Sequence, residues 1–94
     1  MAKDYETAAR ALREAYLGVP ISPLRELLEP VDIDGAYAVQ AINTRLWQDQ
    51  GRRLIGRKIG LTAKAVQAQL GVDRPDLGAL FEDMQIPDGG RLDP

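Results

Sequence analysis

Apolar positions recur at helical spacing along the first part of the chain and predict a helix over residues 4–17. The residues of this stripe are Ala8, Leu12 and Ala15. Ser22 followed by Pro23 is typical of an N-cap and first helical position, which predicts a short second helix after them. The N-terminal part of the chain is therefore expected to be helical.

A longer helix is predicted from Asp32 or Asp34, either of which can cap it, to about residue 50. Gly51 follows as its C-terminal stop. Apolar residues recur along one face of this segment, at Val39, Ile42 and Leu46. This helix completes an expected N-terminal helical region over residues 1–50.

The segment GRRLIGRKIGLT at residues 51–62 has a different pattern. Its apolar, partly β-branched residues predict a short strand, and its glycines mark turns, bulges or close backbone approach. Thr62 is then a good N-cap for a helix over residues 63–70, which Gly71 ends. Residues 72–81, which include proline and glycine, predict an ordered loop. Residues 51–94 thus form a strand, helix and loop segment, and the expected fold class is α+β.

The composition narrows the classes of function. The 94 residues carry 12 basic and 14 acidic side chains, a net charge of −2, which does not favour a nucleic-acid partner. Cysteine and histidine are absent, which excludes disulfides, thiolate or imidazole metal ligands and a histidine general base. No apolar run approaches the ~18 residues of a membrane span, and the N-terminal residues show no signal-like apolar region. We expect a cytoplasmic protein that uses carboxylate, lysine, arginine or tyrosine chemistry.

Four cations lie in the predicted strand segment, at Arg52, Arg53, Arg57 and Lys58. Guanidinium and ammonium groups bind carboxylates and phosphates, but the same pattern is typical of a solvated strand edge. Alternation places Arg52 and Lys58 on one face and Arg53 and Arg57 on the other, unless Gly56 introduces a bulge. Both interpretations of the cations remain open from the pattern alone.

Carboxylates form a second cluster in the predicted loop, at Asp73, Asp76, Glu82 and Asp83. Carboxylates in such a loop act as general bases or bind a divalent cation through oxygen. An aspartate after a proline, as at Asp76, is equally a common turn residue. The spacing does not decide between these roles.

Three motifs add a comparison with known proteins: AYAVQ at residues 36–40, GRRLIGRKIGLT at residues 51–62, and AVQAQLGVDRPDLGALFEDM at residues 65–84. In this order and at these separations they closely resemble the N-terminal portion of the 2-keto-4-pentenoate hydratases. These are also called 2-hydroxypenta-2,4-dienoate hydratases and belong to the fumarylacetoacetate hydrolase superfamily. The resemblance implies the start of a fumarylacetoacetate hydrolase-like fold, whose β-rich catalytic domain is absent from this sequence.

The resemblance also implies an activity and site residues. The family enzymes are hydro-lyases that use Mg²⁺ or Mn²⁺ and hydrate 2-hydroxypenta-2,4-dienoate to 4-hydroxy-2-oxopentanoate in the meta-cleavage degradation of aromatic compounds. Lys58 matches the family lysine that reaches the active site, to neutralise the substrate carboxylate or assist proton transfer. Asp76 matches an aspartate that lines the site, and the backbone around Leu77 is expected to lie close to the substrate. Lys58 and Asp76 are the predicted catalytic residues, and Lys58 and Leu77 the predicted substrate-binding residues.

The family's metal-binding glutamates lie in the larger β-rich domain, so no metal ligand is expected in these residues. We therefore expect the chain alone to bind no metal and to be inactive. The resemblance also implies a homo-oligomer that associates with a pathway decarboxylase. Alternatives within the family are 4-oxalocrotonate decarboxylase and 2-oxohept-3-enedioate hydratase, since Leu77 stands where many members have an aromatic residue. The alternative from another class is a non-catalytic interaction module.

Overall fold

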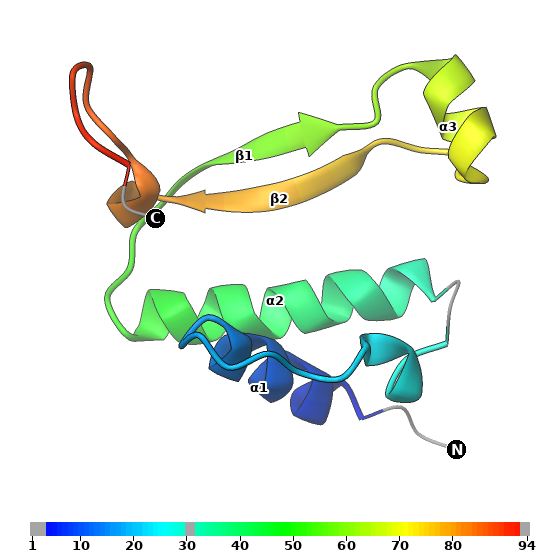
Figure 1. The fold of residues 1–94 in the computed structure, drawn as a ribbon, viewed down its shortest axis with the longest axis horizontal. Coiled ribbons are helices and arrows are strands. Elements are labelled where there is room, and N and C mark those ends of the chain that lie inside the picture. The colour runs from blue at the N-terminus through cyan, green and yellow to red at the C-terminus, as the bar shows by residue number, and fades with distance from the viewer. Residues whose placement is uncertain (1–3, 30–31, 93–94) are drawn as a thin grey trace. The chain divides into compact units, whose positions relative to one another are not determined.

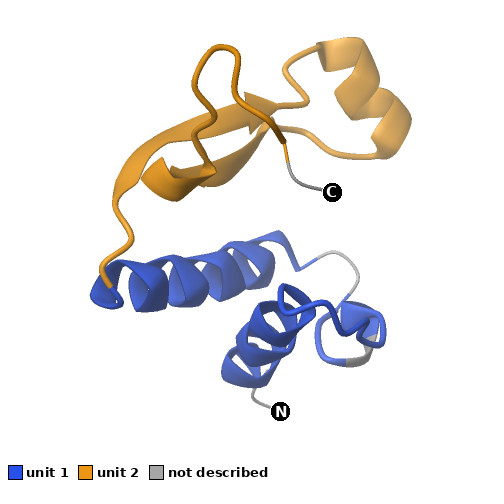
Figure 2. Cartoon of the chain, turned by 60° about the vertical axis from the view of Figure 1, so that its left-hand side comes forward, with its two compact units in different colours: residues 1–50 blue, residues 51–94 orange. Residues whose placement is uncertain are grey.

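The computed structural model of the chain describes residues 4–29 and 32–92. The chain divides into two compact units, residues 1–50 and residues 51–94 (Figure 2). The first unit is built from helices, and the second contains a two-stranded antiparallel sheet and a short helix (Figure 1). The predicted α+β class is confirmed.

The first unit is a packed pair of helices, α1 (Tyr5–Ala15) and α2 (Ile33–Asp49), with the 3₁₀ turn η1 (Leu24–Glu26) between them in the chain. The pattern of small and apolar residues places a compact core where the two helices meet. Its fully buried members are Ala8, Ala9 and Val39. Small side chains at Ala8 and Ala9 let the two helices approach closely, and larger apolar side chains such as Leu12 and Ile42 pack against this core.

Each helix of this unit begins at an aspartate cap. Asp4 Oδ1 accepts a hydrogen bond of 2.9 Å from the backbone N–H of Thr7, and Asp32 Oδ1 accepts one of 2.9 Å from Gly35. These bonds satisfy backbone donors that a helix N-terminus leaves without partners. The structure therefore selects Asp32, and not Asp34, as the cap of α2.

The second unit contains β1 (Leu54–Gly60), α3 (Lys64–Leu70), β2 (Asp76–Phe81) and the 3₁₀ turn η2 (Glu82–Met84). Figure 1 shows α3 at the end of the hairpin, in the connection from β1 to β2. The expected loop is therefore shorter than predicted, because its second half is a strand. Pairing with β1 supplies the hydrogen bonds that offset the low strand propensity of aspartate and glycine in this segment.

The connection from β1 into α3 differs from the sequence prediction at its cap. Ala63 is the N-cap residue of α3 and makes no side-chain cap hydrogen bond, so the predicted cap at Thr62 is wrong. Leu61 adopts a left-handed backbone, with φ of 54°, and its carbonyl accepts a 2.6 Å hydrogen bond from Gln67 Nε2. Gly71, with φ of 75°, ends α3 as predicted. A buried glutamine thus holds the strained residue that follows β1.

The two strands pair with one irregularity. Leu54 pairs with Phe81 and Gly56 with Leu80, so Ile55 is an extra residue in β1, as in a β-bulge. After the bulge the register is regular to the end of β1. The bulge that the sequence analysis considered at Gly56 is therefore present, and it changes which side chains lie on the same face of the sheet.

Within the part of the chain that the structure describes, no helix has the combined length and apolar character needed to cross a membrane.

Candidate functional site

The register of the hairpin brings the two predicted catalytic residues to the same face of the sheet. Lys58 of β1 lies opposite Gly78, and Asp76 of β2 lies opposite Gly60. Lys58 and Gly60 are two residues apart and so project to the same side of β1. Lys58 and Asp76 are therefore diagonal neighbours across the strand pair, a relationship in which Cβ atoms lie about 7–8 Å apart or somewhat less.

Each functional side chain lies over the glycine of the opposite strand. A Cβ atom added at Gly78 would be 3.0 Å from Lys58 Cε and 3.5 Å from its Nζ. A Cβ atom added at Gly60 would be 2.6 Å from Asp76 Oδ1. Absence of a side chain at these glycines lets the ammonium and carboxylate groups lie down across the sheet. This face, formed by Lys58, Asp76, Gly60 and Gly78, is called the lysine–aspartate face below.

The sequence analysis interpreted Gly60, with the other glycines of residues 51–62, as a turn, a bulge or a point of close backbone approach, and it assigned no role to Gly78. A local signal exists, because Lys-x-Gly at residues 58–60 and Asp-x-Gly at residues 76–78 repeat the same spacing. In antiparallel strands paired in this register, such spacing places each glycine under the polar side chain of the other strand. The two spacings therefore indicate this arrangement only when the register between β1 and β2 is known.

Leu77, the third predicted site residue, lies between Asp76 and Gly78 but faces the other way. It pairs with Ile59, and alternation puts both side chains on the face opposite Lys58. Its side chain is 43% exposed. Only the Leu77 backbone lies alongside the lysine–aspartate face, and the contact with substrate that the resemblance implies for it stays a prediction.

The bulge separates the cations of the segment. Arg52 forms two hydrogen bonds with the Asp83 carboxylate, of 2.6 and 2.7 Å, and its guanidinium lies 4.2 Å from the centre of the Phe81 ring. Arg53 is 3.7 Å from Glu82, and Arg57 lies opposite Ala79 on the other face from Lys58. The expected grouping of Arg52 with Lys58 therefore does not hold.

The acidic residues are separated in the same way. The hydrogen bond from Arg52 holds the pKa of Asp83 below its ordinary value of 3.8, and the hydrogen bond from Arg74 does the same for the pKa of Asp73. Glu82 is paired with Arg53. Within residues 4–29 and 32–92, the Asp76 side chain makes no hydrogen bond or ion pair, which leaves its carboxylate accessible on the lysine–aspartate face.

A divalent metal needs several oxygen ligands at one place. Among the described residues, no group of three or more histidine, cysteine, aspartate or glutamate side chains is placed to hold a metal ion. Asp76 contributes one carboxylate to its face of the sheet. The described residues do not by themselves form the kind of site that Mg²⁺ or Mn²⁺ prefers.

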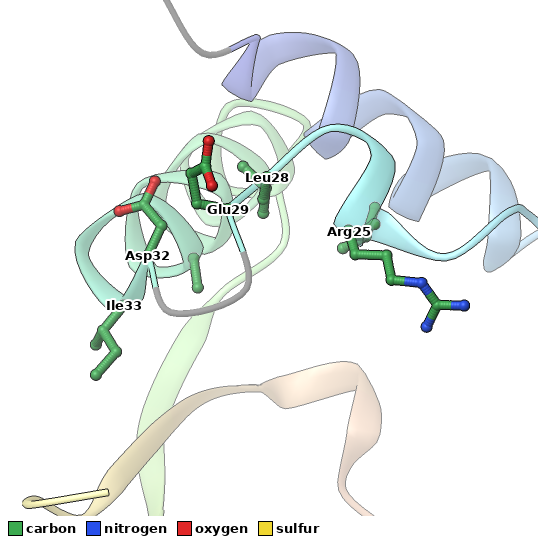
Figure 3. Close-up of a pocket in the computed structure, with 7 residues that line it drawn as sticks. Arg25, Leu28, Glu29, Asp32 and Ile33 are labelled. Carbon is green, nitrogen blue, oxygen red and sulfur yellow. The ribbon is translucent and has the colours of Figure 1, made fainter. Parts of the chain in front are cut away.

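A hollow of about 270 Å³ in the first unit also has charged residues in its lining (Figure 3). Asp32 is already engaged there, because it accepts hydrogen bonds from Gly35 and from the Tyr5 hydroxyl, the latter of 2.9 Å. The figure shows the Arg25 guanidinium pointing away from the Glu29 and Asp32 carboxylates. These charges do not converge on a common point, so the hollow is a weaker candidate site than the lysine–aspartate face.

Comparison with known proteins identifies relatives of one chemical class. No protein-family model matches the chain. Curated proteins that resemble it over most of its length are hydratases, and the chain spans about a third of their length, in the N-terminal part. The chain is therefore a homologue of the N-terminal part of hydratases.

The relatives carry a more specific name. 2-keto-4-pentenoate hydratase 2 of Dechloromonas aromatica (strain RCB) is 62% identical over 85 residues, 89% of this chain and 32% of that protein. The 2-keto-4-pentenoate hydratase of Paraburkholderia xenovorans (strain LB400) is 54% identical over 84 residues, 88% of this chain and 31% of that protein. The predicted resemblance to the N-terminal portion of 2-keto-4-pentenoate hydratases is confirmed.

A hydratase whose name indicates a different substrate is also similar to the chain. The 2-oxo-hept-4-ene-1,7-dioate hydratase of Escherichia coli is 51% identical over 62 residues, which are 66% of this chain and 23% of that protein. The match covers less of the chain than the pentenoate hydratases do. The name of this relative indicates a dicarboxylate, which bears on the alternative substrate considered below.

Proposed function

We propose that this chain supplies the lysine–aspartate face of a hydratase that converts 2-hydroxypenta-2,4-dienoate into 4-hydroxy-2-oxopentanoate. The observation that carries the proposal is the placement of Lys58 and Asp76 on one face of the hairpin, in a chain that is 62% identical over 85 residues to 2-keto-4-pentenoate hydratase 2 of Dechloromonas aromatica. A cation and a carboxylate on the same face of a sheet match an anionic substrate that must also exchange protons.

The two side chains have separate tasks in this proposal. The Lys58 ammonium binds the substrate carboxylate and fixes the conjugated chain against the sheet. The enol proton leaves the 2-hydroxyl as a proton is added at C5, which gives a 2-oxo-3-enoate. Water then forms a bond to C4 and C3 takes up a proton, while the Asp76 carboxylate orients that water and accepts its proton.

The divalent metal implied by the resemblance would need ligands in addition to the described residues. It would supply electrostatic stabilisation of the enolate when bound. The resemblance also supports three further parts of the proposal: a homo-oligomer, association with a pathway decarboxylase, and a cytoplasmic location. Each of these rests on the family comparison and not on a contact within the chain.

A longer dicarboxylate is the second candidate substrate, favoured by the similarity to the Escherichia coli dioate hydratase. Its second carboxylate would need another cation beyond Lys58. The pentadienoate is preferred because the pentenoate hydratases match more of the chain at higher identity. Assays with both substrates separate the candidates, since the preferred substrate has the larger kcat/KM.

The proposal is tested by replacing Lys58 in the natural protein and following hydration of freshly generated 2-hydroxypenta-2,4-dienoate. We expect Lys58→Ala to lower kcat/KM by about 100-fold or more, because a preorganised charge near the reacting groups is lost. Arg57→Ala is the matched control, since it removes a neighbouring cation from the opposite face. Equal activity of the two variants would contradict the role given to Lys58.

A further inference from the structure

We propose that Gly60 and Gly78 are positioning residues, which set the direction of Asp76 and Lys58 by leaving the space into which those side chains lie. The inference rests on the proposed function, because it deepens the account of the same site. It does not assign either glycine a contact with substrate. Each acts through the side chain of the opposite strand.

Backbone conformation does not explain the presence of glycine at these positions. The glycines with positive φ are Gly18, Gly51, Gly71 and Gly89, and neither Gly60 nor Gly78 is among them. Alanine is compatible with extended backbone, and a glycine inside a strand weakens it. What distinguishes Gly60 and Gly78 is the occupied space above the Cα atom.

That space is occupied in each case by the functional side chain. At Gly78 a methyl group would lie 3.0 Å from Lys58 Cε and 3.3 Å from Lys58 Cγ. At Gly60 it would lie 2.6 Å from Asp76 Oδ1. The contact at Gly60 is shorter than real Cβ atoms make, so the Asp76 carboxylate must move, and the contacts at Gly78 are tight enough that Lys58 must shift by a few tenths of an ångström. Movement of a flexible side chain is easier than movement of the backbone, so the strands can stay paired while the charged groups are displaced.

The arrangement is reciprocal, because each strand supplies the glycine over which the charged side chain of the other strand lies. Lys58 extends from β1 over Gly78 of β2, and Asp76 extends from β2 over Gly60 of β1, and the Ile59–Leu77 pair lies between these two cross-strand pairs. Both groups are thereby held close to the sheet surface and beside one another. A methyl group at either glycine lifts one charged group from the sheet and leaves the other in place.

Gly56 provides a matched control on the same strand. It lies on the same side of β1 as Lys58 by alternation, its φ is not positive, and a Cβ added there would meet nothing within 4 Å. Gly56→Ala therefore introduces the same methyl group into β1 without contacting Lys58 or Asp76. Any effect of alanine on strand propensity alone is common to all three variants.

The first measurement is carbon-detected NMR of the lysine Cε and aspartate Cγ signals in the purified chain. We expect Gly78→Ala to shift the Lys58 Cε signal and Gly60→Ala to shift the Asp76 Cγ signal, with backbone amide spectra showing that β1 and β2 remain paired. Gly56→Ala should leave both signals in place. Unshifted signals in folded Gly78→Ala and Gly60→Ala would overturn the inference.

The second measurement is a double-mutant cycle on hydration by the natural protein. We expect Gly78→Ala to lower kcat/KM by about 10- to 100-fold, as for a misplaced catalytic group, and to have no further effect when Lys58 is already alanine. Gly60→Ala should show the same dependence on Asp76 and act mainly on kcat. Equal effects of Gly78→Ala with and without Lys58 would overturn the inference and indicate a structural role.

The two measurements separate the inference from the proposed function. If Lys58→Ala leaves hydration unchanged, the proposed function fails, and the NMR shifts still decide whether the glycines position the side chains. If Lys58→Ala abolishes hydration but Gly78→Ala changes neither the NMR signal nor kcat/KM, the positioning role alone fails. A Gly78→Ala chain that does not fold would also contradict the inference, because it predicts that the strands tolerate the methyl group.

Discussion

At the scale of single residues, the chemistry of the hairpin depends on which charges are already paired. Arg52 and Asp83 form a bidentate ion pair over the Phe81 ring, whereas Lys58 and Asp76 lie over glycines. A bidentate guanidinium–carboxylate pair fixes both partners and reduces their capacity to bind other ions. The same segment therefore contains a bidentate ion pair and, separately, the lysine–aspartate face.

The Arg52–Asp83 pair predicts an acid-sensitive contact. Because the hydrogen bond from Arg52 lowers the folded-state pKa of Asp83 below 3.8, the pair stabilises the folded chain fully above that pH. The stabilisation is lost as the pH falls through the lowered pKa, where the carboxyl becomes protonated. We expect Arg52→Ala to raise the Asp83 midpoint towards its ordinary value in an NMR pH titration.

Arg53→Ala is the control for this titration. It removes a neighbouring cation that lies 3.7 Å from Glu82 and should leave the Asp83 midpoint unchanged. An Asp83 midpoint that is the same in the wild type and in Arg52→Ala would show that the ion pair does not form in solution.

At the scale of elements, the end of β1 is held by a buried side chain from α3. Gln67 is 5% exposed and donates to the Leu61 carbonyl at 2.6 Å. Leu61 itself has a backbone conformation that costs a non-glycine residue of the order of 1–2 kcal/mol. The glutamine thereby fixes the turn that follows Gly60, one of the residues beneath the Asp76 carboxylate.

We predict that Gln67→Leu destabilises the second unit by about 1–2 kcal/mol, because the Leu61 carbonyl loses its buried donor. Urea unfolding followed through the amide signals of β1 and β2 would measure this change. Gln69→Leu, at an exposed position of the same helix, should change stability by less than about 0.5 kcal/mol. Equal losses in the two variants would mean that the hydrogen bond contributes little.

At the scale of the whole molecule, the two units differ in what holds each together. In the first unit, the helix pair surrounds Ala8, Ala9 and Val39, and buried Asn43 accepts a 2.7 Å hydrogen bond from Arg13. Asn43 Nδ2 also donates to the Ala9 carbonyl at 3.1 Å, which ties α2 to α1. The second unit rests on a two-stranded sheet, an architecture that is marginal in water by itself.

This difference predicts uneven protection from hydrogen exchange. We expect backbone amides of β1 and β2 to exchange faster than those in the middle of α2, because local opening of the hairpin exposes less buried surface. Exchange of the purified chain followed by mass spectrometry or NMR would compare the segments. Equal protection in both units would show that they open together.

The candidate site was only partly predictable from the sequence. Lys58 and Asp76 were selected through motifs resembling a known family, since their spacing alone did not distinguish a site from solvated charges. Gly78 was not selected, and Gly60 was interpreted only as a turn, a bulge or a close backbone approach, because the partners of both glycines are on the opposite strand. Residues 76–81 were expected in a loop, because proline, aspartate and glycine lower strand propensity before pairing is considered.

The sequence by itself determined the two long helices, the end of α3 and the relatives. Periodic apolar positions and capping aspartates specify α1 and α2, glycine ends α3, and the GRRLIGRKIGLT and PDLG motifs identify the hydratase relatives. These features depend on residues close together in the chain. Only the tertiary structure decided that Lys58 and Asp76 lie on the same face of the sheet and that Arg52 does not lie on that face. The reason is that the bulge and the strand register pair segments about 20 residues apart in the chain.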